Sequence, residues 1–273
     1  MKLKIHHHTS YQYSTQVFVE PHHLYFYPGI RSYLRLKQFE IKVDPVPDGL
    51  AQRIDAENNP YHQCWFMGQR DSFNIDVHLE LEVSDYNPFD YLIEEVVRKE
   101  KLTGLAPYLN KEHLLSEDLI LWINELFESV SRNKTEFISR LCSEIHGNWT
   151  HEVRYEETLY HPNDCFKAQT GSCRDLSWMM ILILRYCGIP SRFVSGYSYN
   201  PEAEGHELHA WVEAWVYGPG WIGIDPSSGL FTTQFYVPVT ASHHPSLTLP
   251  VQGTYRGEAT SRLHTKVDLK LLD

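Results

Sequence analysis

Regular alternation of apolar and polar residues marks the first part of the chain as strands. Every second residue is apolar in segments 39–43 and 73–83, which is the period of a strand with one buried face and one solvent face. Between these segments, 44–49 and 57–60 are rich in proline, glycine, asparagine and aspartate, and such turns favour antiparallel pairing. We therefore predict a small antiparallel sheet or sandwich over residues 1–87.

The hydrophobic period changes to that of a helix after Asn87-Pro88. Apolar residues then recur at spacings of three and four within 119–130 and again within 137–149, as expected for helices with one buried face. The change of period at the proline predicts a domain boundary. We assign residues 1–87 to an all-β domain and 88–273 to a second domain.

The most apolar predicted helix starts after Ser172, which can cap its first turn, and ends at the glycine and proline of segment 187–190. Because this helix is apolar nearly all round, we expect it to be buried at the centre of the second domain. Three strands are predicted to follow it, and a further edge strand lies near the end of the chain. Their bounds are 192–199, 208–217, 221–225 and 265–271.

Composition and charge exclude several classes of partner. The chain has 273 residues, 42% of them hydrophobic, and a net charge of -11, so it can bury a sizeable core and repels nucleic acid and anionic membranes. No segment approaches the roughly 18 apolar residues of a membrane span, and residues 1–6 lack the apolar core of a secretion signal. We expect a cytoplasmic protein that binds neither nucleic acid nor membranes.

Sixteen histidines raise the question of a metal site. They include the run His6-His7-His8, but this run lies inside an alternating segment, and the HExxH spacing of a zinc enzyme does not occur. The five cysteines are scattered without CxxC spacing, which fits neither a disulfide framework nor a zinc cluster. We expect reduced thiols, no cofactor and no dedicated metal site, beyond adventitious binding of nickel or zinc.

Cys173 is the strongest candidate for a reactive residue. It opens the predicted buried helix, where unpaired N–H groups and the helix dipole stabilise a thiolate. His209 lies on a predicted strand, and Asp225 ends the strand that pairs with it, so the two side chains can meet across a hairpin. A thiolate, an imidazole that moves protons and a carboxylate that orients the imidazole form a nucleophilic triad. Each residue alone has an ordinary structural role, and their joint placement predicts the triad.

Four segments around these residues resemble the transglutaminase-like superfamily, in particular its bacterial members with a papain-type core. The segments are GSCRD at 171–175, LRYCGIPSRFVSGY at 184–197, HAWVE at 209–213 and GWIGIDPS at 220–227. The resemblance implies an α+β fold, with a central helix against an antiparallel sheet, preceded by a small all-β domain. It also implies Cys173 as nucleophile, His209 as general base and acid, and Asp225 as the group that orients the histidine.

Members of this superfamily attack an amide or peptide carbonyl, form a thioester and pass the acyl group to water or to an amine. We therefore expect a cysteine-dependent enzyme with a protein or peptide substrate, and hydrolysis is favoured over transfer since no sequence feature excludes water. The alternative is a non-catalytic binding or scaffolding protein that keeps the fold to hold a peptide. The sequence leaves the substrate, the acyl acceptor and the oligomeric state open.

The donors for the oxyanion of the tetrahedral intermediate are the least defined part of the predicted site. The backbone N–H of Cys173 is one donor if the helix starts there. Candidates for the second donor are Tyr155, Asn163 and Gln169, which all precede the nucleophile, and Trp211 shares a strand face with the histidine. Arg174, beside the thiol, either stabilises the thiolate or points to solvent.

Overall fold

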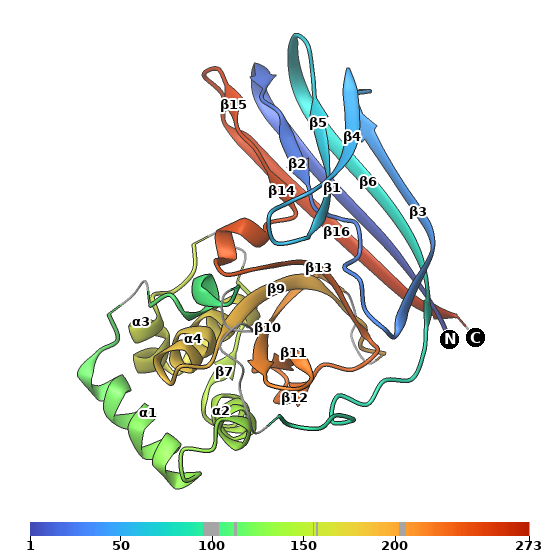
Figure 1. Ribbon diagram of the computed structural model, residues 1–273. Helices are drawn as coiled ribbons and strands as arrows, with labels where there is room; N and C mark the ends of the chain where they lie inside the picture. Colours follow the sequence, from blue (N-terminus) through green and yellow to red (C-terminus); the bar gives the residue numbers. More distant parts are fainter. Residues whose placement is uncertain (95–103, 112–113, 155, 157, 202–205, 273) are drawn as a thin grey trace.

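A computed structural model describes residues 1–94, 104–111, 114–154, 156, 158–201 and 206–272. In this part of the chain a β-sandwich packs against a core in which helices cover a curved antiparallel sheet (Figure 1). The predicted α+β fold with an all-β region is therefore confirmed. No helix within the described residues is long and apolar enough to cross a bilayer.

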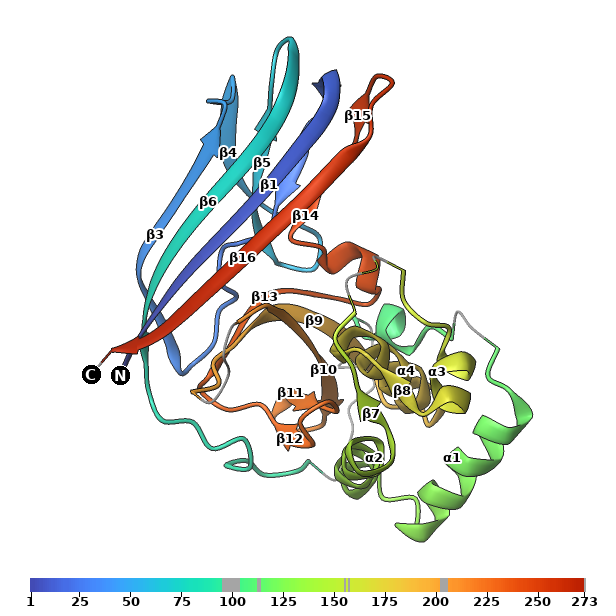
Figure 2. The same cartoon turned by 180° about the vertical axis from the view of Figure 1, so that it is seen from behind.

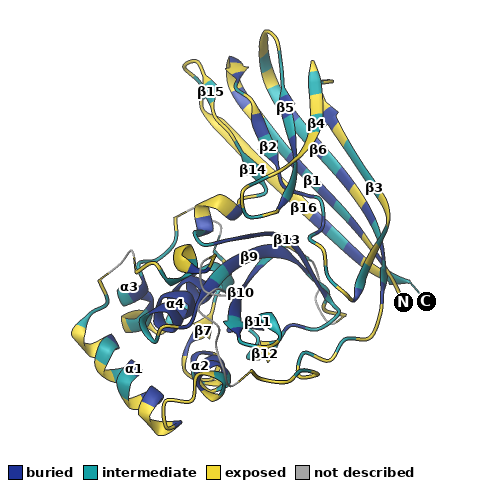
Figure 3. Cartoon of the chain, in the orientation of Figure 1, coloured by how far each residue is buried: buried dark blue, intermediate teal, exposed yellow. Residues whose placement is uncertain are grey.

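The sandwich consists of two antiparallel sheets whose facing sides share one apolar core. The first sheet contains β1 (Lys2–Val19), β3 (Leu34–Asp44), β6 (Gln69–Val83), β15 (Tyr255–Arg256) and β16 (Ser261–Leu272). The second contains β2 (His22–Leu24), β4 (Gly49–Ile54), β5 (Pro60–Trp65) and β14 (Val251–Gln252). Along β1 and β6 buried residues alternate with more exposed ones (Figure 3). The period-two pattern of the sequence is thus confirmed as the signal of a half-buried sheet.

The last strand of the chain belongs to this sandwich. A strand was predicted at 265–271, and β16 is present there as an edge strand, but its partner is β1 rather than a strand of the helical core. The register runs antiparallel from Lys2 opposite Leu272 to Tyr13 opposite Ser261, so the two ends of the chain lie side by side (Figures 1 and 2). A division of the chain at residue 88 stays a prediction, and the sandwich also takes in strands from residue 251 onward.

The helical part of the core matches the predicted periodic segments. Its elements are α1 (Glu117–Ser129), α2 (Lys134–Asn148), α3 (Pro162–Ala168) and α4 (Cys173–Tyr186), with short 3-10 turns η2 (Ala106–Leu109) and η3 (Pro245–Thr248). The three predicted helices correspond to α1, α2 and α4, and their apolar faces meet in one cluster. Every residue of α4 from Asp175 to Arg185 is buried, as expected for its composition (Figure 3). The seven residues of α3 are too few to give a periodic signal, and this helix was not predicted.

The curved sheet of the core lies directly against α4. Its strands, in the order β12-β11-β10-β9-β13, are β9 (Ser191–Ser198), β10 (Leu208–Val216), β11 (Gly220–Asp225), β12 (Leu230–Phe231) and β13 (Tyr236–Ser242). A two-residue parallel pair, β7 (Thr150–His151) and β8 (Thr170–Gly171), adjoins the start of α4. The predicted strands that follow α4 are confirmed as β9, β10 and β11, whereas β13 was not predicted.

Small side chains on β10 allow α4 to approach the sheet closely. Ala210, Val212 and Ala214 face the helix and belong to its apolar cluster, while Trp211 lies on the opposite face of the strand. That face is crowded as well: a Cβ on Gly196 of β9 would come within 2.7 Å of the Trp211 ring and 2.2 Å of the Val237 carbonyl oxygen. Glycine at this position is therefore required for β9 to pass between Trp211 and β13.

The sandwich and the curved sheet are joined by both apolar and charged contacts. Tyr197 of β9 is fully buried in the apolar core of the sandwich, and its hydroxyl lies 2.9 Å from Nδ1 of the buried His7 on β1. Glu213 of β10 is 4% exposed and forms ion pairs with Arg31, from the segment between β2 and β3, and with Arg192 on β9. Burial on its own would raise the pKa of Glu213, but the two guanidinium groups lower it below the ordinary value.

We expect Glu213→Gln to lower the free energy of unfolding by about 3 kcal/mol, because removal of the carboxylate leaves two poorly solvated arginines without their counter-charge. Chemical denaturation followed by tryptophan fluorescence measures the change. The matched control is Glu128→Gln, which removes an exposed carboxylate from its pair with Arg132 and is expected to change stability by less than about 0.5 kcal/mol. Equal effects of the two substitutions would contradict the role of the Glu213 contacts.

Candidate active site

Cys173 is the first residue of α4, and the turn before it is fixed by a buried carboxylate. Asp175 accepts hydrogen bonds from the backbone N–H of Ser172 at 2.9 Å and from its hydroxyl at 2.6 Å. The same carboxylate pairs with Arg154 at 2.7 Å and accepts the N–H of Tyr160, also at 2.7 Å. Burial would raise the pKa of Asp175, but these donors lower it. The turn before Cys173 is thus held by the ionised Asp175 carboxylate. As the first residue of α4, Cys173 has a backbone N–H without an acceptor inside the helix.

His209 and Asp225 lie on neighbouring strands and form a short ion pair. His209 is on β10 and Asp225 ends β11, and Nε2 of the imidazole lies 2.7 Å from Oδ2 of the carboxylate. The ring contacts the Cys173 thiol as well, and because Nε2 is occupied by Asp225, Nδ1 is the nitrogen that faces the sulfur. The predicted residues Cys173, His209 and Asp225 are therefore brought together in space.

The Asp225 carboxylate is surrounded by donors that the sequence did not reveal. Ser227 donates to Oδ1 through its N–H at 3.0 Å and its hydroxyl at 2.6 Å, and the Tyr236 hydroxyl donates to Oδ2 at 2.9 Å. Tyr236 starts β13, which lies beyond β10 and β9 in the sheet, and it reaches Asp225 because the sheet is strongly curved (Figure 1). Burial would raise the pKa of Asp225, but His209, Ser227 and Tyr236 lower it far below the ordinary range. This residue stays ionised.

The three groups together favour a thiolate paired with an imidazolium. Burial raises the pKa of Cys173, but the His209 charge and hydrogen bonds from His151, His209 and the Ala210 N–H lower it to about 6. Burial also lowers the pKa of His209, whereas Asp225 and the Cys173 thiolate raise it well above its ordinary value. Near neutral pH the thiol has therefore lost its proton while the imidazole keeps one. This is the charge state of an activated cysteine nucleophile.

His151 is a second histidine at the nucleophile, and sequence reasoning missed it. It lies on β7 opposite Gly171 of β8, next to the turn that leads into Cys173. Its side chain is exposed on one side and hydrogen-bonded to the thiol, and this bond raises the pKa of His151. A strand of two residues has no periodic signal, so only the pairing of β7 with β8 identifies this histidine as part of the site.

The other residues that were considered for the site have different surroundings. Gln169 is the exposed residue that caps the C-terminus of α3, with a φ of 50°, and it lines a surface hollow with Trp122 and Phe166. Trp211 is 1% exposed, and its ring centroid lies 6.3 Å from that of His209; it therefore forms the wall behind the histidine. Tyr155 lies outside the described residues.

The Arg174 side chain does not simply point to solvent. Its guanidinium donates to the backbone carbonyls of Arg154 at 3.0 Å and Glu156 at 2.8 Å. Arg174 thereby holds the segment that precedes α3. Asp175 holds the same segment through its contacts to Arg154 and Tyr160. Both polar residues after the nucleophile therefore serve to position its surroundings.

Ligand-type side chains close enough to share a metal ion occur elsewhere in the molecule. In the part of the chain that the structure describes, His6, Asp76 and His78 each place one ligand atom within 4.8 Å of the others, on the outer face of the sandwich.

Comparison with known proteins agrees with the fold and with these motifs. Residues 124–226 match the model of the transglutaminase-like superfamily, and residues 3–82 match that of the bacterial transglutaminase-like N-terminal region. A solved structure of a proposed cysteine protease from Cytophaga hutchinsonii superimposes with a TM-score of 0.72 at 18% identity, covering 100% of this chain and 92% of that one. At this identity the likeness establishes the fold alone.

Two relatives in sequence are similar over shorter stretches. An uncharacterized protein of Mycobacterium leprae is 31% identical over 116 residues, which cover 40% of this chain and 40% of that protein. The protein-glutamine gamma-glutamyltransferase of Pseudomonas aeruginosa is 36% identical over 70 residues, which cover 23% of this chain and 10% of that protein. The chain thus matches less than half the length of each of these relatives.

We expect iodoacetamide to label Cys173 with a rate that rises through about pH 6 and is constant above it, because the thiolate is the reactive form. In His209→Ala the midpoint should move to about 8.5 or above, since burial then outweighs the remaining stabilisation. Cys187 is an internal control: it is also partly exposed, but burial raises its pKa to about 11, so it should label slowly near neutral pH. Labelling of Cys173 only after denaturation would contradict the assignment.

We expect His151→Ala to move the same midpoint upward by about one pH unit, since a hydrogen bond to a charged group contributes about 1.5 kcal/mol. This shift should be smaller than that of His209→Ala. Thr150→Ala, on the same short strand, is the matched control and should leave the profile unchanged. An unchanged profile in His151→Ala would show that the hydrogen bond to the thiol contributes nothing to its ionisation.

Proposed function

The chain carries a transglutaminase-like core behind the N-terminal region of bacterial transglutaminase-like proteins, and on this premise we propose that it is a cysteine-dependent enzyme that transfers acyl groups from carboxamide or peptide substrates. The observation that carries the proposal is the thiolate of Cys173 paired with the His209 imidazolium, which is backed by Asp225. A protein that only held a peptide would not need a cysteine whose pKa is lowered to about 6. The scaffolding alternative is therefore the weaker one.

The proposed reaction proceeds through a thioester. The Cys173 thiolate attacks the carbonyl carbon of the substrate, and the carbonyl oxygen takes up the negative charge. The backbone N–H of Cys173, at the start of α4, supports this oxyanion. His209 gives its proton to the leaving nitrogen as the C–N bond breaks, which leaves a thioester and a neutral imidazole.

The second half of the reaction restores the enzyme. The neutral imidazole of His209 accepts a proton from water or from an amine as this acceptor attacks the thioester carbonyl. The C–S bond then breaks, the acid or the new amide leaves, and the thiolate is paired with an imidazolium again. Asp225 keeps the imidazole in the orientation that both proton transfers require, because its own position is fixed by Ser227 and Tyr236.

Water is the acceptor that we favour, with an amine as the second candidate. Cys173 is partly exposed and His151 borders it on a solvent-accessible side, so water has access to the thioester. Transfer to an amine is supported by the similarity to a Pseudomonas aeruginosa protein that is named as a protein-glutamine gamma-glutamyltransferase. Protein or peptide substrates are proposed in both cases.

The expected activity is measured with a glutamine-containing peptide, alone and with a primary amine, by ammonia release and by mass spectrometry of the peptide. Hydrolysis gives glutamate, transfer gives the amine adduct, and peptide-bond cleavage gives fragments. Cys173→Ala should abolish whichever product forms, because it removes the nucleophile. Cys187→Ala removes a partly exposed cysteine away from the triad and should retain the activity.

The scaffolding alternative predicts a different result. Peptides would then bind with the same affinity to the native protein and to Cys173→Ala. No product and no acyl adduct on Cys173 would be found by mass spectrometry, even under conditions where the thiol is labelled by iodoacetamide.

A further inference from the structure

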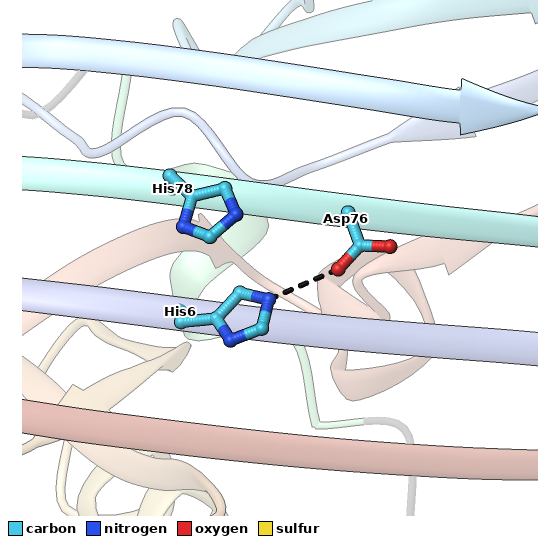
Figure 4. Close-up of side chains that lie close together, drawn as sticks. All are labelled: His6, Asp76 and His78. Carbon is cyan, nitrogen blue, oxygen red and sulfur yellow. Dashed lines mark hydrogen bonds and ion pairs between the residues drawn. The ribbon is translucent and has the colours of Figure 1, made fainter.

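Histidine and aspartate side chains gather on the outer face of the first sheet, away from Cys173. Because side chains alternate along β1, His7 is buried while His6 and His8 point to the outer face. In the antiparallel register His6 lies opposite His78 of β6, and His8 lies opposite Asp76. The residues come from strands about 70 positions apart in the chain and meet only through this register (Figure 4).

The Asp76 carboxylate connects the two histidines of β1. Its Oδ1 lies 2.9 Å from Nε2 of His6, and its Oδ2 lies 3.0 Å from Nδ1 of His8. The rings of His6 and His78 are stacked, with centroids 4.3 Å apart and planes at 3° (Figure 4). One ligand atom from each of His6, Asp76 and His78 lies within 4.8 Å of the others.

The pairing of two histidines differs from the neighbouring row of the same face. There Lys4 lies opposite Glu80 with 3.6 Å between the charged atoms, which is an ordinary cross-strand ion pair. The row of His6 and His78 instead brings two imidazole rings face to face. A neutral imidazole has a free lone pair, and it is the form that binds metal ions.

We propose that His6, Asp76 and His78 form a binding site for a divalent transition-metal ion of the zinc type. Two imidazole nitrogens and one carboxylate oxygen are a ligand set that suits Zn²⁺ better than Ca²⁺ or Mg²⁺, which prefer oxygen ligands. Water completes a tetrahedral site. The site is independent of the proposed function at Cys173.

The spacing of the ligands is close to what such an ion requires. Ligand atoms at zinc bond lengths lie about 3.4 Å apart in a tetrahedral site, and the His6 nitrogen and the Asp76 oxygen are now 2.9 Å apart. The ion takes the place of the hydrogen between them, and His6 binds it through Nε2 as a neutral ring whose hydrogen is on Nδ1. In the structure the planes of the His78 and His6 rings are nearly parallel, so the His78 ring turns about its Cβ–Cγ bond to point its lone pair to the ion. The exposed position of His78 leaves room for this turn.

His8 has a supporting role in the proposed site. It holds Oδ2 of Asp76 while Oδ1 binds the ion, and an outer hydrogen bond of this kind orients a metal-bound carboxylate. Asp268 of β16, whose Oδ2 is 4.0 Å from Nδ1 of His6, lies beyond hydrogen-bond distance and adds a negative charge beside that ring. The expectation of no dedicated metal site rested on motifs within the sequence, and this group has no motif because its members are far apart in the chain.

The test is a calorimetric titration of ZnCl₂ into the full chain carrying Cys173→Ala, a background that removes the thiolate as a competing zinc ligand. We expect one ion per chain, and a loss of affinity of at least about tenfold in Asp76→Asn and in His78→Ala. Zinc should also raise the Tm of the parent by about 3 °C or more and raise that of the two variants less. His264→Ala, which removes an exposed histidine from β16 opposite Ser10 of the same sheet, is the matched control and should bind zinc like the parent.

Cobalt gives a second measurement that does not depend on heat release. Co²⁺ bound at the site should show the visible absorption of a tetrahedral complex, and this absorption should be absent in Asp76→Asn. Equal zinc affinity in Asp76→Asn, His78→Ala and His264→Ala would overturn the proposal and show adventitious binding by surface histidines. Zinc affinity no tighter than about the millimolar range in the parent would overturn it too.

Discussion

The packing of α4 against β10 is the contact on which the active-site geometry depends. An almost wholly apolar helix has to be covered on every side, and β10 meets it with small side chains so that helix and strand come close. The contact is fixed at Ala210, whose carbonyl accepts the Ser177 hydroxyl at 3.4 Å and whose N–H is bonded to the Cys173 sulfur. Since Ala210 is the neighbour of His209, the same contact sets the distance between sulfur and imidazole.

Buried carboxylates hold the elements around this contact in place. Asp175 joins the start of α4 to Arg154 and Tyr160, Asp225 joins β11 to β13, and Glu213 joins the curved sheet to the sandwich. The pKa of each is lowered because its donors outweigh the cost of burial. Their contribution to stability is therefore present above the ordinary carboxyl pKa near 4 and is lost as the pH falls through the lower folded values. Low pH therefore weakens both the surroundings of Cys173 and the junction between the sandwich and the curved sheet.

Local sequence signals were enough to predict that Cys173, His209 and Asp225 lie together, and they identified most of the elements. Cys173 follows a helix cap, and His209 and Asp225 lie on consecutive strands joined by a tight turn, so short-range patterns place all three. His151 and Tyr236 were missed because their roles depend on a two-residue strand pair and on the curvature of a sheet. The same limit applied to β16, whose pattern identified a strand but not its partner, and to Arg174, whose acceptors lie some twenty residues earlier.

The pairing of the last strand with the first has a consequence for the order of events during synthesis. β1 leaves the ribosome early and can pair with β6 as soon as residue 83 has emerged, but its other edge stays open until β16 is made. At roughly 5–20 residues per second, the synthesis from residue 83 to the end of β16 takes roughly 10–40 seconds. During it the nascent chain exposes a long unpaired edge to other chains. The histidines and lysines that alternate along β1 keep one face of this edge polar while it waits for its partner.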